Sequence, residues 1–186
     1  DFDSYEFLCE FVDTVAKTGC STFLVHARKA WLKGLSPKQN REIPELNYDR
    51  VYQLKKDFPD LEIIINGGIT TLEQSSEHLK HLDGVMVGRE VYTNPYLLAS
   101  VDQIIYGTDN PIKTREKVAE EFLKYVDNEL SKGTKLNAMT RHILGLFHGM
   151  PGARQYRRHI SENAHKPSAT IEVLQTALEK TSGVNG

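Results

Sequence analysis

The sequence has few cysteines and no long hydrophobic run. Its 186 residues include only two cysteines, Cys9 and Cys20, which excludes a disulfide-stapled secreted scaffold. No stretch approaches the roughly 18 consecutive apolar residues of a membrane-spanning helix. Charged residues make up 26% and apolar residues 39% of the chain, as in ordinary globular proteins. These features predict a cytoplasmic protein of one or two domains that does not bind membranes.

Acidic residues are absent from one block of the chain. Residues 131–160 contain six Lys and Arg and no Asp or Glu, whereas residues 1–130 contain 15 basic and 22 acidic residues. Because the net charge of the whole chain is −2, this block is a local basic patch in an acidic protein. Such a patch favours contact with nucleic acid, although a solvated helix face is the alternative.

Two pairs of basic residues are candidates for that contact. Arg154 and Arg157 lie three apart on a predicted helix and therefore share a face. Lys38 and Arg41 have the same spacing within a long polar loop, residues 29–46. A loop of that length is usually functional or disordered, and its basic residues and tryptophan favour a function.

The chain is organised around two short apolar runs that end at glycine. Residues 61–65 precede Asn66, Gly67 and Gly68, and residues 84–87 precede Gly88 and Arg89. A parallel strand buried on both faces has this pattern. An Asn-Gly pair could instead form a hairpin turn. The sequence Thr70-Thr71-Leu72-Glu73 reads as a capping box, so a helix is predicted to follow rather than a returning strand.

The first part of the chain is predicted to alternate helices and strands. Three parallel strands in series indicate an α/β sheet, but a complete (β/α)8 barrel needs about 250 residues. If the fold is a barrel, these strands are numbers six to eight. The predicted helices are 4–18, 47–57, 71–81 and about 89–99, and the predicted strands are 20–25, 61–65 and 84–87.

The candidate site residues stand where predicted strands end. His26 and Asn66 would face the mouth of a barrel, where they can hydrogen-bond a ligand. Gly67, Gly68 and Gly88 leave main-chain N–H groups accessible to an anion, and Arg89 can bind a phosphate with two hydrogen bonds. The alternatives are a structural histidine, an asparagine used for turn formation, and glycines used only for positive φ.

Beyond Gly107 the pattern becomes all-helical. Four helices are predicted, separated by glycines and prolines, and they form a small bundle. Their predicted ranges are 113–131, 136–148, 152–163 and 168–181. His78 and His81, on the third helix of the first part, are predicted to lie at the surface, and without a third ligand they do not indicate a metal site.

Several of these motifs together resemble the tRNA-dihydrouridine synthase family, in particular its A subfamily. The resemblance spans nearly the whole chain. Its most specific parts are the loop motif Ser-Pro-Lys followed by Asn-Arg-Glu-Ile-Pro and the arginine-rich helix. The motifs lie at 25–30, 35–38, 40–44, 65–69, 83–89, 141–144 and 152–158.

The resemblance implies a TIM barrel that binds FMN, over residues 1–107, followed by a helical tRNA-binding domain, over residues 108–186. It implies that NADPH reduces the flavin, which passes hydride to D-loop uridines at tRNA positions 20 and 20a. His26, Asn66, Gly67 and Gly68 would contact FMN, and Gly88 and Arg89 would hold its phosphate. Lys38, Arg41, Arg154 and Arg157 match positions that touch tRNA.

One part of the family pattern is missing from the chain. The family's catalytic cysteine lies in an Asn-x-Gly-Cys-Pro context, which does not occur here, so no catalytic residue is assigned and neither Cys9 nor Cys20 takes that role. The chain also starts without Met and at a helix cap, so it is expected to be a C-terminal half that lacks the N-terminal half and is inactive alone. The rival functions are another FMN barrel oxidoreductase acting on a small molecule, and a fragment that only binds RNA.

Overall fold

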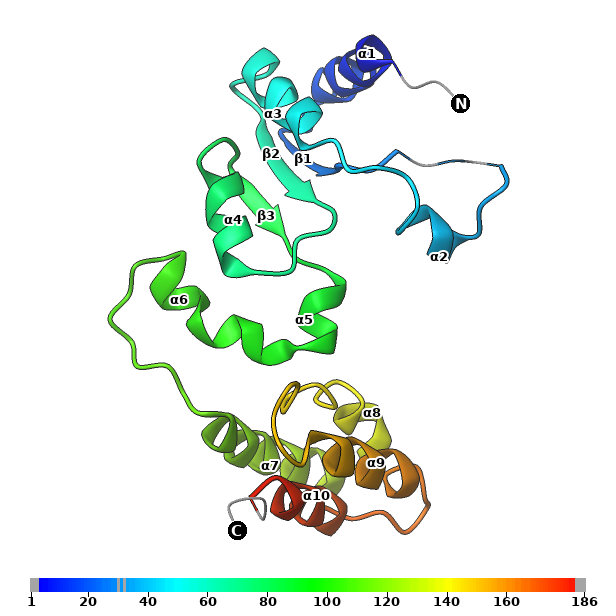
Figure 1. Cartoon of the computed structure of the whole chain (residues 1–186), viewed down its shortest axis with the longest axis vertical. Helices are drawn as coiled ribbons and strands as arrows, with labels where there is room; N and C mark the ends of the chain where they lie inside the picture. The colour runs from blue at the N-terminus through cyan, green and yellow to red at the C-terminus, as the bar shows by residue number, and fades with distance from the viewer. Residues whose placement is uncertain (1–3, 30, 32, 183–186) are drawn as a thin grey trace. The chain divides into compact units, whose positions relative to one another are not determined.

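The computed structural model describes residues 4–29, 31 and 33–182, and Figure 1 shows the order of their elements. The chain divides into two compact units on either side of the bond between Gly88 and Arg89. No helix in the described part of the chain combines the length and the apolar character needed to cross a membrane.

The first unit contains a parallel sheet of three strands in the order β1-β2-β3. This confirms the predicted α/β alternation with a parallel sheet. In Figure 1 the segment that carries α2 extends away from the sheet, and α3 and α4 lie beside the strands. The elements are α1 (Tyr5–Ala16), β1 (Thr22–His26), α2 (Pro37–Asn40), α3 (Tyr48–Asp57), β2 (Glu62–Asn66), α4 (Leu72–Leu79) and β3 (Gly84–Met86).

The strand register brings the predicted site residues to one level. His26 pairs with Asn66 across β1 and β2, and Asn66 pairs with Met86 across β2 and β3. All three strands therefore end at the same edge of the sheet. Ligands of α/β proteins bind outside this carboxyl edge.

The core of the first unit forms where α1, α3 and the sheet meet. Ile63 and Ile65 of β2 are fully buried, and Leu54 of α3 is equally inaccessible. Burial of one such side chain contributes roughly 1.5–3 kcal/mol to stability. The other buried apolar members of the cluster are Val12, Ala27, Val51, Ile69 and Leu82.

The helix after the glycine turn begins one residue later than predicted. The capping box uses Thr71 and Gln74, with the Thr71 hydroxyl accepting the Gln74 N–H at 3.2 Å, and not Thr70 and Glu73. The Gln74 side chain accepts the N–H of Thr70 at 2.8 Å, so Thr70 becomes part of the turn. The prediction of a helix rather than a returning strand is confirmed.

The second unit is helical. The predicted single helix 89–99 is wrong, because Asn94 has φ −135° and ψ 73° and Pro95 then starts a 3-10 helix. A residue before proline is disfavoured in the helical region. The elements are α5 (Arg89–Thr93), the 3-10 helix Pro95–Ser100, α6 (Val101–Ile104), α7 (Arg115–Ser131), α8 (Leu136–Thr140), α9 (Ala153–Asn163) and α10 (Glu172–Ser182).

The predicted helix 136–148 is also wrong, because α8 ends at Thr140. Tight turns follow, in which Leu146 donates to the Ile143 carbonyl and His148 donates to the Gly145 carbonyl. Four of the five residues 143–147 are apolar and at least half-buried. A single helical face cannot turn all of them inward, whereas tight turns can.

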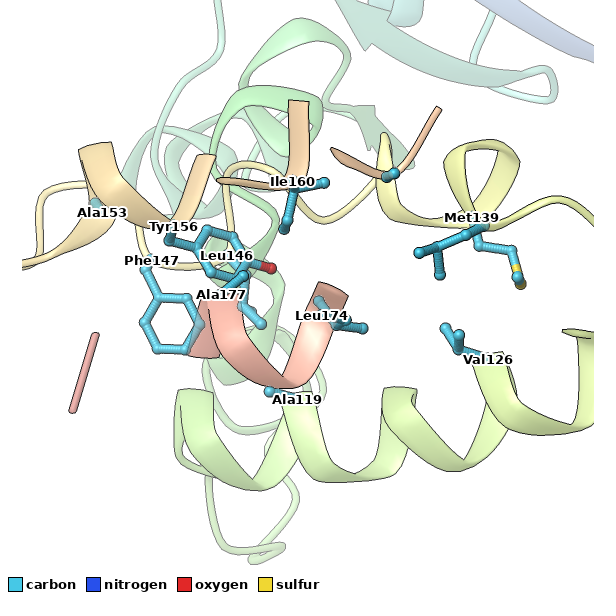
Figure 2. Close-up of a cluster of buried hydrophobic side chains, with 12 residues drawn as sticks. Ala119, Val126, Met139, Leu146, Phe147, Ala153, Tyr156, Ile160, Leu174 and Ala177 are labelled. Atoms are coloured by element: carbon cyan, nitrogen blue, oxygen red, sulfur yellow. The ribbon is translucent and has the colours of Figure 1, made fainter. Parts of the chain in front are cut away.

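The helices α7, α8, α9 and α10 and the turns after α8 enclose the core of the second unit. Figure 2 shows Tyr156 of α9 above Phe147, with Ala177 and Leu174 of α10 beside them. The rings of Phe147 and Tyr156 are 5.0 Å apart and meet edge to face at 63°. Burial raises the pKa of Tyr156, and its hydroxyl donates to the Ile143 carbonyl at 3.2 Å.

The division between the units falls earlier in the chain than the predicted domain boundary after Gly107. The segment from α5 to the 3-10 helix packs within the second unit. Its Tyr96 ring lies 4.0 Å below the Arg115 guanidinium of α7, and its hydroxyl donates to the Lys113 carbonyl at 2.8 Å. The functional division into residues 1–107 and 108–186 stays a prediction.

Candidate functional site

The carboxyl edge of the sheet carries the first candidate site. The Asn66 side-chain amide donates one hydrogen to the Met86 carbonyl at 2.8 Å. The main-chain carbonyl of Asn66 accepts the Ala27 N–H at 2.8 Å. Asn66 thereby joins the ends of all three strands. Its side chain is held in one orientation, which leaves its second amide hydrogen and its oxygen as the groups suited to a ligand.

The position of the proton on His26 follows from a local hydrogen bond. The Arg28 main-chain N–H donates to His26 Nδ1 at 3.1 Å. Because Nδ1 accepts, the neutral ring carries its proton at Nε2. The exposed His26 side chain therefore offers a hydrogen-bond donor at the carboxyl edge of β1.

Gly67 and Gly68 form a turn that only glycine fits. Their φ angles are +125° and +68°, in the region that L side chains rarely adopt. A Cβ on Gly68 would lie 2.5 Å from Leu46 Cδ1, and a Cβ on Gly67 would lie 3.1 Å from Leu46 Cδ2 and 3.3 Å from His26 Cε1. The structure thus brings His26, Asn66 and the two glycines together, as the sequence predicted from strand ends alone.

Leu46 and Tyr48 complete the turn, and the sequence analysis missed both. The Tyr48 hydroxyl donates to the Gly67 carbonyl at 2.9 Å. Leu46 and Tyr48 come 19 or more residues before the glycines in sequence, so no periodicity connects them. The only available signal is their place just before and just inside the predicted helix 47–57.

Gly88 and Arg89 follow β3. A Cβ on Gly88 would meet only Asn66 Nδ2, at 4.0 Å, so the space beside this glycine is open. Arg89 is exposed and opens α5. The two residues are consecutive in the chain but belong to different compact units.

His78 is buried, and the prediction that it lies at the surface is wrong. It is 5% exposed, its Nδ1 shares a hydrogen bond of 2.7 Å with the Tyr52 hydroxyl, and the Tyr48 ring stands edge-on to it at 4.5 Å. Its spacing with the buried Leu72 and Ser75 of α4 places it on the apolar helix face. Burial, with a smaller contribution from His81, lowers the pKa of His78.

This lowered pKa predicts a loss of stability in mild acid. Below the unfolded pKa of about 6.5 the unfolded chain takes up a proton that folded His78 does not, so the free energy of unfolding decreases as pH falls. Urea unfolding at about pH 7.5 and about pH 5.5 measures this effect. The decrease in the free energy of unfolding between the two pH values should be smaller for His78→Gln than for the wild type. The same substitution at an exposed histidine, His165→Gln, is the matched control. An equal decrease in wild type and His78→Gln would contradict the assignment.

The described residues of the loop that carries Lys38 and Arg41 are held by hydrogen bonds. The Asn40 side chain accepts the Trp31 N–H at 2.7 Å and donates to the Trp31 carbonyl at 2.8 Å. The Arg28 guanidinium donates to the Glu42 carbonyl at 3.1 Å and to the Pro44 carbonyl. Lys38 and Arg41 are both exposed.

A cavity of about 710 Å³ lies beside the second half of this loop. Apolar and charged residues of both signs line it, so its charge alone does not select an anion. The lining residues are Lys29, Trp31, Ile43, Pro44, Glu45, Leu46, Asn47, Tyr48 and Asp49.

Arg154 and Arg157 lie on α9, as predicted. This helix buries Ala153, Tyr156 and Ile160, whereas Arg154 is exposed and Arg157 is half-buried. Among the described residues neither Arg154 nor Arg157 has an ion-pair partner, whereas the next residue, Arg158, pairs with Glu162 at 2.8 Å. The two unpaired arginines fit a contact with an anionic partner.

The sequence is similar to those of known proteins. A sequence model described as dihydrouridine synthase (Dus) matches residues 1–182. Curated proteins called tRNA-dihydrouridine(20/20a) synthase are 63% identical in Vibrio cholerae, over 97% of this chain and 55% of the relative. The protein of Vibrio vulnificus is 64% identical over 97% of this chain and 56% of the relative. The protein of Escherichia coli K12 is 58% identical over 96% of this chain and 52% of the relative. The chain thus spans about half the length of these relatives.

Proposed function

The chain belongs to the dihydrouridine synthase family, and from this premise we propose that it supplies the C-terminal half of a flavin-dependent tRNA-dihydrouridine synthase. The enzyme would reduce uridines 20 and 20a of tRNA to 5,6-dihydrouridine. The observation that carries the proposal is the extent of the family match, which runs through both compact units. It includes the glycine turn of the first unit and the arginine helix of the second.

The strands and the C-terminal helices each have a proposed place in the whole fold. The three parallel strands correspond to about strands six to eight of a TIM barrel, and residues 108–186 correspond to a helical tRNA-binding domain. The parallel order β1-β2-β3 and the common level of the strand ends agree with a barrel segment. The other half of the barrel would come from the N-terminal half of the full-length protein.

The glycine turn fits a bound flavin mononucleotide. The turn requires glycine, because a Cβ on Gly68 would lie 2.5 Å from Leu46 Cδ1, and a main chain without side chains can approach a planar or anionic ligand closely. We assign His26, Asn66, Gly67 and Gly68 to FMN, and Gly88 and Arg89 to its phosphate. When bound, FMN supplies hydride transfer, with NADPH as the reductant.

In this arrangement the chain's own residues bind and orient. His26 donates from Nε2, because Nδ1 is occupied by the Arg28 N–H, and Asn66 is held in place by Met86. Lys38, Arg41, Arg154 and Arg157 bind tRNA phosphates. No residue of this chain is assigned as the proton donor, which is proposed to lie on the N-terminal half.

The test is to incubate the full-length protein with FMN, NADPH and unmodified tRNA and to map reduced uridines by mass spectrometry. We expect two hydrogens to be gained at uridines 20 and 20a, and none in tRNA in which both are replaced by cytidine. NADPH oxidation that does not depend on tRNA would favour the small-molecule oxidoreductase. Binding of tRNA by a protein that takes up no flavin would favour the RNA-binding fragment.

A further inference from the structure

We propose that Tyr48 is a positioning residue for the cofactor, because it holds the Gly67–Gly68 turn in its binding shape. This inference rests on the proposed function, since it assumes that the turn contacts FMN. Tyr48 itself would act through the main chain of Gly67 and not through the ligand. Three sets of contacts support the proposal.

The first set lies at the turn. The Tyr48 hydroxyl donates to the Gly67 carbonyl at 2.9 Å, and the same oxygen would lie 3.2 Å from a Cβ on Gly68. The Tyr48 hydroxyl therefore lies beside both glycines of the turn. Gly67 and Gly68 can rotate through more conformations than other residues, so a hydrogen bond that fixes the Gly67 peptide restricts where the neighbouring N–H groups point.

The second set fixes Tyr48. The main-chain N–H of Asn47 donates to the Ala27 carbonyl at 2.7 Å, and Leu46 forms a bridge with Arg28. The segment that enters α3 is thus attached to the end of β1, beside His26. The Tyr48 hydroxyl is held on the carboxyl edge of the sheet by the same strand that carries a proposed flavin contact.

The third set holds the Tyr48 ring. His78 of α4 meets it edge to face, at 4.5 Å and 69°. His78 is in turn hydrogen-bonded to the Tyr52 hydroxyl, which lies one helical turn after Tyr48 on α3. The chain therefore offers two tyrosines in one aromatic cluster, of which one hydroxyl bonds the glycine turn and the other bonds only a buried histidine among the described contacts.

This pair gives a matched experiment. Tyr48→Phe and Tyr52→Phe each remove one hydrogen-bonded hydroxyl and keep the ring, so their effects on packing are comparable. In the full-length protein we expect Tyr48→Phe to raise the dissociation constant of FMN, measured by flavin fluorescence, roughly fivefold, the effect of one lost hydrogen bond. It should also change the visible circular dichroism of the bound flavin. Tyr52→Phe should change the dissociation constant of FMN by less than twofold and should leave the visible circular dichroism of the bound flavin as in the wild type.

Hydrogen exchange tests the turn without any cofactor. In the 186-residue chain, peptides covering residues 66–70 should exchange faster in Tyr48→Phe than in the wild type and in Tyr52→Phe. Unchanged exchange there and an FMN affinity within twofold of wild type would overturn the inference. Equal weakening by both variants would overturn it as well, because it would indicate general loosening of the cluster. If wild-type protein takes up no FMN, the proposed function fails, and the exchange result still decides whether Tyr48 holds the turn.

Discussion

Replacing Gly152 with alanine is expected to destabilise the second compact unit by about 3 kcal/mol, the sum of a strained backbone and an overpacked contact. Gly152 precedes the first residue of α9 and has φ +77° and ψ −12°. A Cβ there would clash with the Lys180 carbonyl oxygen and would lie 2.9 Å from Thr181 Cα. Neither is the end of a flexible side chain, so α9 or α10 has to move. The measurement is urea unfolding followed by circular dichroism.

Gly149 separates the two causes. Its φ of +76° nearly equals that of Gly152, but a Cβ there would meet nothing within 4 Å. Gly149→Ala should therefore cost only the backbone strain, about 1 kcal/mol. The difference between the two variants, about 2 kcal/mol, then measures the contact between α9 and α10. Equal losses of stability in both variants would show that α9 and α10 move apart to admit the added methyl group without any loss of stability.

The second large effect is expected from Arg154→Ala combined with Arg157→Ala. If each arginine neutralises one tRNA phosphate, the double variant loses two ionic contacts. The slope of the logarithm of the binding constant against the logarithm of salt concentration should decrease by about two. Affinity at low salt should fall roughly tenfold or more. Filter binding or electrophoretic shift of tRNA across a salt series measures both quantities, and flavin content should not change.

Arg158→Ala is the control on the same helix. It removes one positive charge where the double variant removes two, and because Arg158 is paired with Glu162 at 2.8 Å, much of that charge is already compensated. Its effect on the salt slope should be clearly less than half that of the double variant. A double variant with the salt dependence of the wild type would remove α9 from the proposed tRNA contact.

The strands and most helices of this chain could be predicted because sequence and local physics agree there. Residues 61–65 are apolar except for Glu62 and are followed by Asn66 and two glycines, a pattern that favours a strand of a parallel sheet. Asn47 was expected to lead its helix, and its side chain does accept the Arg50 N–H at 3.0 Å. The placement of His26 and Asn66 at the same edge of the sheet followed from the parallel order of the strands alone.

The missed features depend on contacts between distant segments. Residues 136–148 looked helical, but Gly145 packs against the Thr93 carbonyl so closely that a Cβ would clash, and the chain takes tight turns around that contact. His78 looked exposed because histidine is polar, although its spacing with Leu72 already placed it on the buried face of α4. Tyr48 could not be linked to Gly67 by any local rule.

The aligned strand ends of the first unit also limit how this chain can change in length during evolution. Side chains alternate between the two faces of a strand, so one residue gained or lost within Thr22–His26 would turn His26 to the opposite face and break its pairing with Asn66. Insertions and deletions among relatives are therefore expected to be absent from β1 and β2.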